Sequence, residues 1–385
     1  MTYMVGRILL VVGTRPEAIK MVPVYQALKQ RGAQVFLCAT NQHTSLLEQV
    51  FTVFGVTADI KLDIMKPGQD LFYITQAILE KMRNVIEEYN PALLAVHGDT
   101  TTAFAAALSA FYKKVPVAHI EAGLRSGDIF APYPEEMNRK CITQMASYHF
   151  APTAFNVGQL LSEGVARDRV YCTGNTVVDS LHYVQANIEQ HPDLVGVEVV
   201  ARITQCKKKG HHVMLLTAHR RESLDGDIIH ALRAIAQFLD QHADLYALFP
   251  VHPNPRVMEA VCQAGLDKHA QVMLVPALSY RDLVYVLSQV DWVVTDSGGL
   301  QEESVSLGRP VLVLRDVSER AECFWEGFGR LVGTSGDLII SGLQDCYDGV
   351  MLKKTASAIY GDGKASVRIA EIMYSLLSGE RNKSI

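Results

Sequence analysis

The sequence lacks a long apolar segment, an excess of basic charge and any paired-cysteine motif. Its first apolar run, Ile8–Val12, is far too short for a secretory signal or a membrane-spanning helix. The 36 Lys and Arg residues against 41 Asp and Glu residues give a net charge of −5. This balance argues against binding to nucleic acid or to an anionic membrane surface. None of the seven cysteines forms a C-x-x-C pair, so we expect reduced thiols in a cytoplasmic protein, without disulfides or a zinc site.

Several motifs that mark cofactor or catalytic sites are also missing. No G-x-G-x-x-G follows an apolar run, which disfavours a standard dinucleotide-binding fold, and no G-x-x-x-x-G-K-[ST] marks a P-loop. H-E-x-x-H and G-x-S-x-G are absent, and the 13 histidines show no metal-ligand spacing. We therefore expect neither a redox cofactor nor a metal, and no nucleophile of the hydrolase type.

Short apolar runs alternate with longer amphipathic stretches along the whole chain. The expected strands are Ile8–Val12, Val35–Ala39, Leu93–His97, Val117–Ile120, His149–Ala151, Val213–Thr217, Leu245–Val251, Val272–Val275, Trp292–Thr295 and Val311–Leu314. The expected helices are Pro16–Gln30, Asp70–Tyr89, Thr101–Tyr112, Glu135–Ala146, Thr176–Gln190, Asp225–Gln241, Tyr280–Leu287 and Gly299–Leu307. Apolar strands separated by helices indicate an α/β protein with parallel sheets covered on both faces.

The strands fall into two groups, and 385 residues favour two domains. Residues 191–210 between the groups are polar and weakly patterned, and we expect their Lys207–Lys209 triplet to be a solvated loop. The boundary should lie between Tyr171 and Asn175. We predict two doubly wound domains, with the ligand site where strand ends face the cleft between them.

The first strand is followed by Gly13-Thr14-Arg15-Pro16-Glu17-Ala18-Ile19-Lys20. Pro16 suits the first turn of a helix, and the glycine allows a tight turn. The helix start offers free N–H groups to an anion, with Arg15 at the sheet edge and Lys20 about one turn further. We favour an anion site here over a plain strand–helix turn with a surface arginine.

A second turn of this kind is Thr295-Asp296-Ser297-Gly298-Gly299-Leu300-Gln301-Glu302-Glu303. Ser297 can cap the helix, and the two glycines leave backbone amides open to a diphosphate. Glu303 lies beyond the first turn, where its carboxylate could accept from two vicinal hydroxyls. The alternative is a plain capped helix.

Acidic residues follow several strands of the first domain. Asp99 is either a ligand group or the N-cap of the next helix, and capping is slightly favoured when it is considered alone. Glu121 ends another strand, while Glu135 and Glu136 begin a helix whose dipole alone could account for them. We expect Asp99, Glu121 and Glu135 to converge at one sheet edge, where paired carboxylates can divide acid and base roles.

Polar residues also follow strands of the second domain. His219, with Arg220 and Arg221 beside it, could exchange protons or bind phosphate, or be structural. The segments Pro250–Pro255 and Arg315–Arg320 end two further strands.

Seven of these segments occur in an order that is highly specific as a set: Gly13–Lys20, His97–Thr102, Glu121–Arg125, Pro134–Arg139, Thr173–Thr176, His219–Glu222 and Asp296–Glu303. Together they resemble the non-hydrolysing UDP-N-acetylglucosamine 2-epimerases over nearly the whole chain. The resemblance implies two Rossmann-like domains in the GT-B arrangement, with UDP-sugar in a deep interdomain cleft. It implies an N-terminal domain of residues 1–173 completed by a helix within 364–385, and a UDP-binding domain of residues 174–363.

The resemblance also implies roles for matching residues. Those assigned to catalysis are Asp99, Glu121, Glu135 and His219. Those assigned to the UDP-sugar are Arg15, Lys20, His219, Leu283, Ser297, Gly298, Gly299, Glu303 and Arg320. It implies a homodimer that supplies cell-surface polysaccharide synthesis. A second, regulatory UDP-GlcNAc site in bacterial relatives maps to the region of Asn41–Thr44, where this chain has Asn-Gln-His-Thr instead of the common Gly/Ala-Gln-His-Arg.

The chain departs from the family pattern at three further places. Leu283 stands where an aromatic residue commonly packs on uracil, and a leucine covers a base without stacking as well. Ser304-Val305 replaces Ala-Pro, and Ala321 replaces a proline. The Leu283 and Ser304-Val305 changes leave open a relative that acts on a modified UDP-hexosamine.

The expected chemistry needs no redox cofactor. The hydrogen at C2 of an N-acetylhexosamine is not adjacent to a carbonyl carbon, so its direct removal gives an unstabilised carbanion. Expelling UDP from C1 while C2 loses a proton avoids this, provided cations and helix N-termini hold the diphosphate. The alternatives are a hydrolysing epimerase that releases ManNAc and UDP, a GT-B glycosyltransferase, and a non-catalytic nucleotide-sugar sensor.

Overall fold

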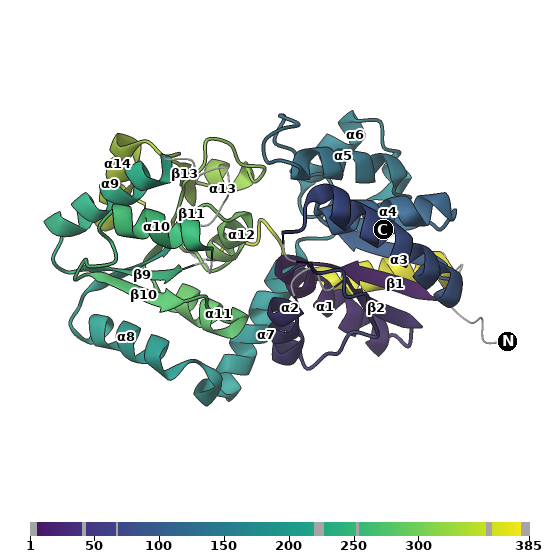
Figure 1. Ribbon diagram of the computed structural model, residues 1–385, viewed down its shortest axis with the longest axis horizontal. Helices are drawn as coiled ribbons and strands as arrows, with labels where there is room; N and C mark the ends of the chain where they lie inside the picture. Colours follow the sequence, from purple (N-terminus) through teal and green to yellow (C-terminus); the bar gives the residue numbers. More distant parts are fainter. Residues whose placement is uncertain are drawn as a thin grey trace. The chain divides into compact units, whose positions relative to one another are not determined.

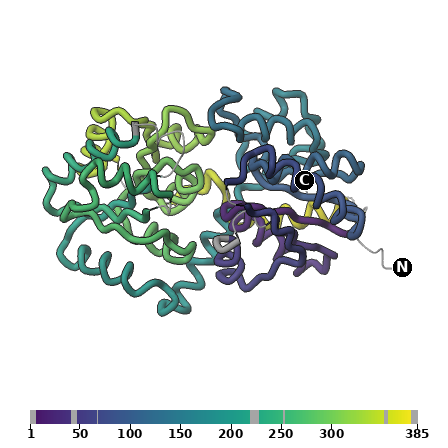
Figure 2. Tube along the Cα trace, in the orientation of Figure 1, coloured from purple at the N-terminus to yellow at the C-terminus, as the bar shows by residue number. Residues whose placement is uncertain are grey.

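The computed structural model describes residues 6–40, 44–66, 68–218, 227–251, 254–351 and 356–378. The chain divides into two compact units, which we call unit 1 (Met1–His182 with Tyr360–Ile385) and unit 2 (Tyr183–Ile359). Figure 2 shows unit 1 as purple to teal together with the yellow C-terminal end. The divide falls inside helix α7 (Thr176–Gln190), later in the chain than the boundary expected from the sequence.

Unit 1 is built on a parallel sheet, drawn with its helices in Figure 1. In the described residues its strands run in the order β3-β2-β1-β4-β5-β6-β7. They are β1 (Ile8–Val12), β2 (Val35–Ala39), β3 (Ile60–Lys61), β4 (Leu93–His97), β5 (Val117–Ile120), β6 (Tyr148–Ala151) and β7 (Val170–Cys172). The helices are α1 (Arg15–Gln30), α2 (Thr44–Phe54), α3 (Leu71–Tyr89), α4 (Thr101–Tyr112), α5 (Glu135–Met145), α6 (Ala154–Ser162), the start of α7, and α15 (Ala365–Ser378). Helix α1 contacts α2 and α15, while α4 contacts α3 and α5, so helices form two separate layers.

Local sequence explains why these elements form. All five residues of β1 are buried, as expected for a central strand covered on both faces. Helix α3 begins after Asp70, whose carboxylate accepts from the Tyr73 amide at 2.8 Å. Its buried residues, Ile74, Ile78 and Met82 among them, repeat every four positions and so share one face.

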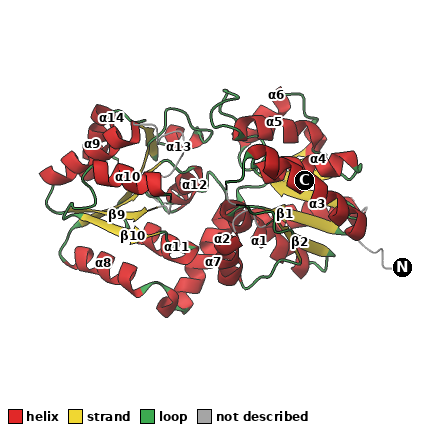
Figure 3. Cartoon of the chain, in the orientation of Figure 1, coloured by secondary structure: helices red, strands yellow, loops and turns green. Residues whose placement is uncertain are grey.

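Unit 2 has the same construction. Its strands run in the order β10-β9-β8-β11-β12-β13 within the described ranges. They are β8 (His212–Thr217), β9 (Leu245–Val251), β10 (Val272–Pro276), β11 (Trp292–Thr295), β12 (Val311–Val313) and β13 (Gly329–Leu331). The helices are α8 (Val197–Lys208), α9 (Asp227–Gln241), α10 (Pro255–Gln263), α11 (Tyr280–Gln289), α12 (Gly298–Ser306), α13 (Glu322–Trp325) and α14 (Gly336–Tyr347). Figure 3 shows the alternation of helix and strand in both units.

The stretch 191–210 differs from its expectation. It contains helix α8, whose buried residues Val199, Ile203 and Cys206 follow helical spacing. The expected loop is therefore wrong, because Lys207 lies in the last turn of α8 and pairs with Asp291 at 2.6 Å. Lys208 and Lys209 are exposed, as expected for a solvated segment. The short strands β3, β7 and β13 were not expected either.

The strand order determines where ligands can meet each sheet. In unit 1 the order reverses between β1 and β4, and in unit 2 between β8 and β11. Open α/β sheets bind ligands beyond the carboxyl ends of the strands at such a switch point. The turns after these four strands carry the motifs at Gly13, His97, Thr217 and Asp296.

Candidate functional site

The turn after β1 is held by a residue to which the sequence gave no role, Glu17. Its Oε2 accepts from the amides of Gly13 at 3.0 Å and Thr14 at 2.7 Å, and from the Thr14 hydroxyl at 2.8 Å. Its Oε1 accepts from the Thr100 hydroxyl at 2.7 Å. These two amides, which precede the first helical residue Arg15, therefore face a carboxylate. The anion site expected at the helix start stays a prediction, and Arg15 is half-buried there.

Burial makes the Glu17 carboxyl a weaker acid than usual. It is 2 % exposed, and burial raises its pKa from 4.5 to about 7, although the donors from Thr100, Thr14 and Gly13 lower it. The threonine–glutamate spacing is that of a capping box, a signal by which the sequence could have identified the residue. Glu17 thus joins the β1–α1 turn to the β4–α4 turn.

Glu121 lies at the carboxyl end of β5 in a strained conformation. Its φ is +62°, in the left-handed region that side chains other than glycine rarely adopt. The residue is buried, and its Oε2 accepts from Lys20 Nζ in a short contact and from Asn175 Nδ2 at 2.7 Å. His97 Nε2 lies 3.6 Å from the same oxygen. The structure therefore brings together two predicted site residues, Lys20 and Glu121.

Asp99 is not the helix cap. Helix α4 is capped by Thr100, whose hydroxyl accepts from the Ala103 amide at 3.0 Å. The Asp99 carboxylate instead binds Arg139 Nη2 at 2.6 Å, and the Asp99 carbonyl accepts from Asn138 Nδ2 at 2.9 Å. The capping role that the sequence slightly favoured is thus wrong, and Asp99 is tied to helix α5.

Helix α5 carries the paired glutamates, which have different environments. Glu135 is the first residue of the helix and is half-buried. Glu136 is fully buried; it accepts from the Ser126 amide at 3.0 Å and lies 3.3 Å from Arg139 Nη1. The helix dipole alone does not account for Glu136. Its carboxylate contacts both the loop at Ser126 and Arg139, the arginine that binds Asp99. Through Arg139 and Asn138, the first turns of α5 reach the β4–α4 turn.

Two histidines behind this edge are uncharged. His119 and His149 are paired across β5 and β6 with ring centroids 6.5 Å apart. Burial lowers the pKa of His119 to about 3 and that of His149 to about 4. A ring nitrogen of His119 hydrogen-bonds the Gly98 carbonyl at 2.7 Å. The interior below Glu121 is therefore kept free of positive charge from these rings at neutral pH.

In unit 2, the turn after β11 has an open helix N-terminus. The Thr217 and Thr295 hydroxyls hydrogen-bond each other at 2.6 Å, and Thr295 Oγ1 accepts from the Ser297 amide at 2.9 Å. Ser297 occupies the N-cap of α12, but its side chain makes no cap hydrogen bond, contrary to expectation. A Cβ added to Gly299 would meet no atom within 4 Å, so space is open beside this turn.

Arg320 packs directly on Gly298. A Cβ at Gly298 would lie 2.4 Å from Arg320 Nη1, so the close approach requires glycine. The buried guanidinium donates to Glu302 at 2.8 Å and to Glu319 at 2.5 Å. Two carboxylates thus face a cation that the resemblance assigned to the UDP-sugar. Glu303, one residue after Glu302 in α12, is also buried.

Of the remaining predicted ligand residues of unit 2, the structure describes Leu283. Leu283 lies half-buried on α11, and the Ser279 hydroxyl caps this helix by accepting from the Asp282 amide at 3.1 Å. His219, Arg220 and Arg221 lie outside the described residues, as do positions 252 and 253 of Pro250–Pro255.

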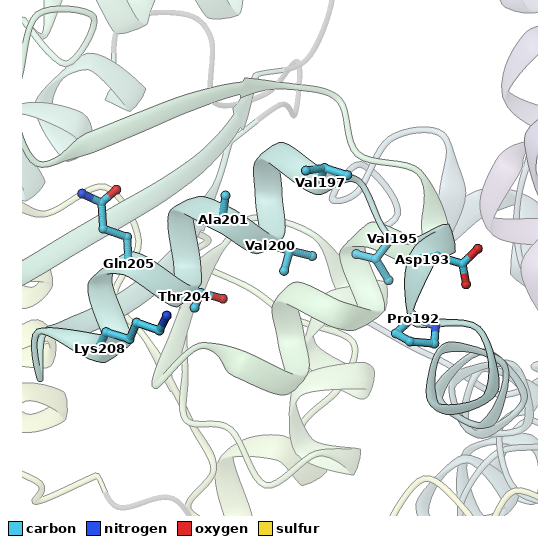
Figure 4. Close-up of a pocket in the computed structure, with 9 residues that line it drawn as sticks. All are labelled: Pro192, Asp193, Val195, Val197, Val200, Ala201, Thr204, Gln205 and Lys208. Carbon is cyan, nitrogen blue, oxygen red and sulfur yellow. The ribbon is translucent and has the colours of Figure 1, made fainter.

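Unit 2 also has a pocket of about 560 Å³ away from these turns. Figure 4 shows its lining, which comes from α8 and the turn before it. The residues are Pro192, Asp193, Val195, Val197, Val200, Ala201, Thr204, Gln205 and Lys208. No predicted site residue lines this pocket, so it is distinct from the proposed ligand residues.

In the ranges that the structure describes, no group of three or more His, Cys, Asp or Glu side chains could hold a metal ion. Over the same ranges, no helix combines the length and the apolar character needed to cross a bilayer.

Similarity to known proteins covers nearly the whole chain. Residues 26–374 match the family model described as UDP-N-acetylglucosamine 2-epimerase. A Ralstonia nicotianae protein named as a probable UDP-N-acetylglucosamine 2-epimerase is 42% identical over 94% of this chain and 97% of its own. The UDP-N-acetylglucosamine 2-epimerase of Yersinia pestis is 41% identical over 95% and 98%.

A solved structure agrees with this match. The UDP-GlcNAc 2-epimerase of Neisseria meningitidis, bound to UDP-GlcNAc, superposes with a TM-score of 0.89 and 38% identity, covering 95% of this chain and 99% of that one. The predicted fold class, α/β with two Rossmann-like domains of the GT-B type, is thereby confirmed. From the family match, the identity and the fold, we conclude that this chain belongs to the UDP-N-acetylglucosamine 2-epimerase family.

Proposed function

We propose that the chain interconverts UDP-GlcNAc and UDP-ManNAc by inverting C2 of the sugar. The observation that carries this proposal is the near-full-length similarity to proteins named for that activity. The organisation of carboxylates at the sheet edge of unit 1 supports it further, because a proton must leave one face of C2 and return to the other.

The reaction is an elimination followed by an addition. In the first step a base takes the C2 proton, the electrons of that bond form the C1–C2 double bond, and the C1–oxygen bond to UDP breaks. The products are a 2-acetamidoglucal and UDP. In the second step a diphosphate oxygen of UDP attacks C1 while an acid delivers a proton to the opposite face of C2. The reaction needs no external oxidant or reductant.

Unit 1 supplies the acid and base groups in this proposal. Glu121 and Glu135 form the acid–base pair, with the face that each serves left unassigned. Asp99, whose Oδ2 binds Arg139 at 2.6 Å, orients one of them or serves as an alternate base. Arg15 and His219 stabilise the departing diphosphate.

Unit 2 supplies the UDP groups. The amides of Gly298 and Gly299 at the start of α12 bind the diphosphate, as the open space beside Gly299 allows, and the Ser297 hydroxyl, which makes no cap hydrogen bond, adds a donor. Glu303 accepts from the ribose hydroxyls, and Leu283 covers the base. Arg320 supports the turn through Gly298. That one ligand contacts both units stays a prediction from the sequence, as do the homodimer and a regulatory UDP-GlcNAc near Asn41–Thr44.

The test is an NMR time course of UDP-GlcNAc with the protein in heavy water, without an acceptor. We expect UDP-ManNAc to accumulate to equilibrium with deuterium at C2. Glu121→Gln and Glu135→Gln should each lower kcat by about 10²- to 10⁴-fold. Glu87→Gln, which alters a surface carboxylate paired with Lys113, is the matched control and should retain wild-type kcat.

Other outcomes identify the competing functions. Free ManNAc with UDP would identify a hydrolysing enzyme, and turnover that begins only after an acceptor is added would identify a glycosyltransferase. UDP-GlcNAc binding without turnover would identify a sensor. Epimerisation of a substituted UDP-hexosamine in preference to UDP-GlcNAc would identify the modified-substrate alternative that Leu283 and Ser304-Val305 left open. Product without deuterium at C2 would refute the elimination.

A further inference from the structure

A buried carboxamide contacts Glu121 from a distant part of the chain. Asn175 is 2 % exposed and lies between β7 and α7, far in sequence from β5. Its Nδ2 donates to Glu121 Oε2 at 2.7 Å, while its Oδ1 accepts from the Val177 amide at 3.0 Å. The amide donor at Val177 fixes which end of the carboxamide is oxygen, so the group facing Glu121 is the donor.

The backbone of Asn175 is fixed as firmly as its side chain. Its amide donates to the Tyr360 carbonyl at 2.6 Å. The neighbouring Gly174 has a φ of +88°, and a Cβ there would lie 3.2 Å from the Cα of Gly361, whose φ is +127°. Two backbone turns therefore meet closely at a place where side chains would interfere. Residue 175 begins the segment that leaves unit 1 through α7, and Tyr360 begins the segment that returns to it.

From these contacts we propose that Asn175 is a positioning residue for Glu121, placing its carboxylate for proton transfer at C2. The inference rests on the proposed function, since it gives Glu121 an acid–base role. Lys20 supplies the opposite charge, but an ammonium on a flexible stem fixes direction poorly. Asn175 adds a neutral donor from a rigid turn and so fixes the oxygen without adding charge.

The expected size of the effect follows from geometry. Acid–base catalysis depends on placement, and an error of about 1 Å can cost about 100-fold in rate. The strained backbone of Glu121, with φ of +62°, has an alternative to relax into once a side-chain contact is lost. We therefore expect a 10- to 100-fold loss of kcat when the Asn175 donor is removed.

Three substitutions separate the hydrogen bond that Asn175 donates to Glu121 from the one that it accepts from the Val177 amide at the start of α7. Asn175→Ser and Asn175→Asp both keep an acceptor for the Val177 amide, since serine and aspartate are good N-caps. Serine does not reach Glu121, whereas aspartate places a second carboxylate against it. Asn175→Ala removes both cap and donor. In the full-length protein we measure Tm, UDP affinity by calorimetry, and kcat and KM for UDP-GlcNAc by NMR.

The positioning role predicts a specific split. The Ser variant should keep UDP affinity and KM within about three-fold and Tm within a few degrees, yet lose 10-fold or more in kcat. The Asp variant should lose more kcat and also lower Tm, because its carboxylate is buried against that of Glu121. Asp179→Asn is the matched control. It lies in the first turn of α7 and binds the amides of Ala365 at 3.1 Å and Ser366 at 2.8 Å at the start of α15. It should lower Tm and leave kcat within two-fold.

Each other result counts against a particular claim. Wild-type kcat in Asn175→Ser and Asn175→Asp, with a lower Tm only in Asn175→Ala, would reduce Asn175 to a helix cap and overturn the inference alone. Equal loss of kcat in Asp179→Asn would also overturn it, because any disturbance of α7 would then suffice. A wild-type chain that turns over no UDP-GlcNAc would overturn the proposed function, and the inference with it.

Discussion

Replacing the buried Glu17 with glutamine should change how stability depends on pH. Burial raises the pKa of this carboxyl from 4.5 to about 7 in the folded protein. Between these two values the folded chain keeps a proton that the unfolded chain releases. Stability from this group is therefore fully present below pH 4.5 and is lost as pH rises through 7.

The magnitude follows from the size of the shift. Each pKa unit corresponds to about 1.4 kcal/mol, so a rise from 4.5 to about 7 corresponds to about 3 kcal/mol of unfolding free energy. Glutamine does not titrate, and this pH-dependent part should vanish in Glu17→Gln. Glutamine keeps a carbonyl oxygen that can accept from the Gly13 and Thr14 amides, so any loss of stability relative to wild type should be largest at low pH and should shrink as pH rises.

The assay is urea unfolding of both proteins from pH 4.5 to 8, followed by circular dichroism. Both tryptophans, Trp292 and Trp325, lie in unit 2, so their fluorescence reports on that unit and serves as an internal control. His119 and His149 titrate in an overlapping range with the opposite sign, but they are common to both proteins and cancel in the difference. A difference between wild type and Glu17→Gln that stays constant over this range would refute the reasoning.

Two further predictions concern packing and buried charge. Gly298→Ala should destabilise unit 2 by about 1–3 kcal/mol, because its Cβ would lie 2.4 Å from the Arg320 guanidinium. Gly299→Ala, whose Cβ would meet nothing within 4 Å, should instead raise the free energy of unfolding by about 0.4–1 kcal/mol while weakening UDP binding. Urea unfolding measures the stability of both variants and calorimetry measures UDP binding. A Gly299→Ala variant less stable than Gly298→Ala would contradict this. Burial lowers the pKa of His119 to about 3, so its neutral ring contributes to the free energy of unfolding above pH 6.5. This contribution declines as pH falls, by about 2 kcal/mol between pH 6.5 and 5. His119→Gln should lack that decline in unfolding measurements, and an identical pH slope in wild type would count against it.

The fold could be predicted where one physical signal dominated. Central strands such as Ile8–Val12 and Leu93–His97 coincide with their expected bounds, because burial on both faces demands continuous apolar residues. Helix α8 was missed because Val197, Val200 and Ala201 interrupt the spacing of its three buried residues, Val199, Ile203 and Cys206, and blur the amphipathic pattern. Strand β3 has two residues, too few for any periodicity to identify.

The candidate site could be predicted as a set of turns but not as a set of contacts. Parallel strands place their carboxyl ends at one edge, so Asp99 and Glu121 could be selected from local sequence. The partners of these residues come from elsewhere: Arg139 from α5, Lys20 from α1 and Asn175 from the β7–α7 turn. Strand order determines which of these meet, and a single sequence does not state that order.

The partners of buried charged groups did not follow from local sequence either. The resemblance assigned Arg320 to the UDP-sugar, and the structure shows its guanidinium donating to Glu302 and Glu319 beside Gly298. A buried arginine with two carboxylates determines the shape of its surroundings, since removing one partner leaves a charge uncompensated. Glu17 had no predicted role, yet its carboxylate accepts from the Gly13 and Thr14 amides and joins two turns. In both turns a buried carboxylate holds its neighbours in place, and which neighbours it meets depends on the fold rather than on the adjacent sequence.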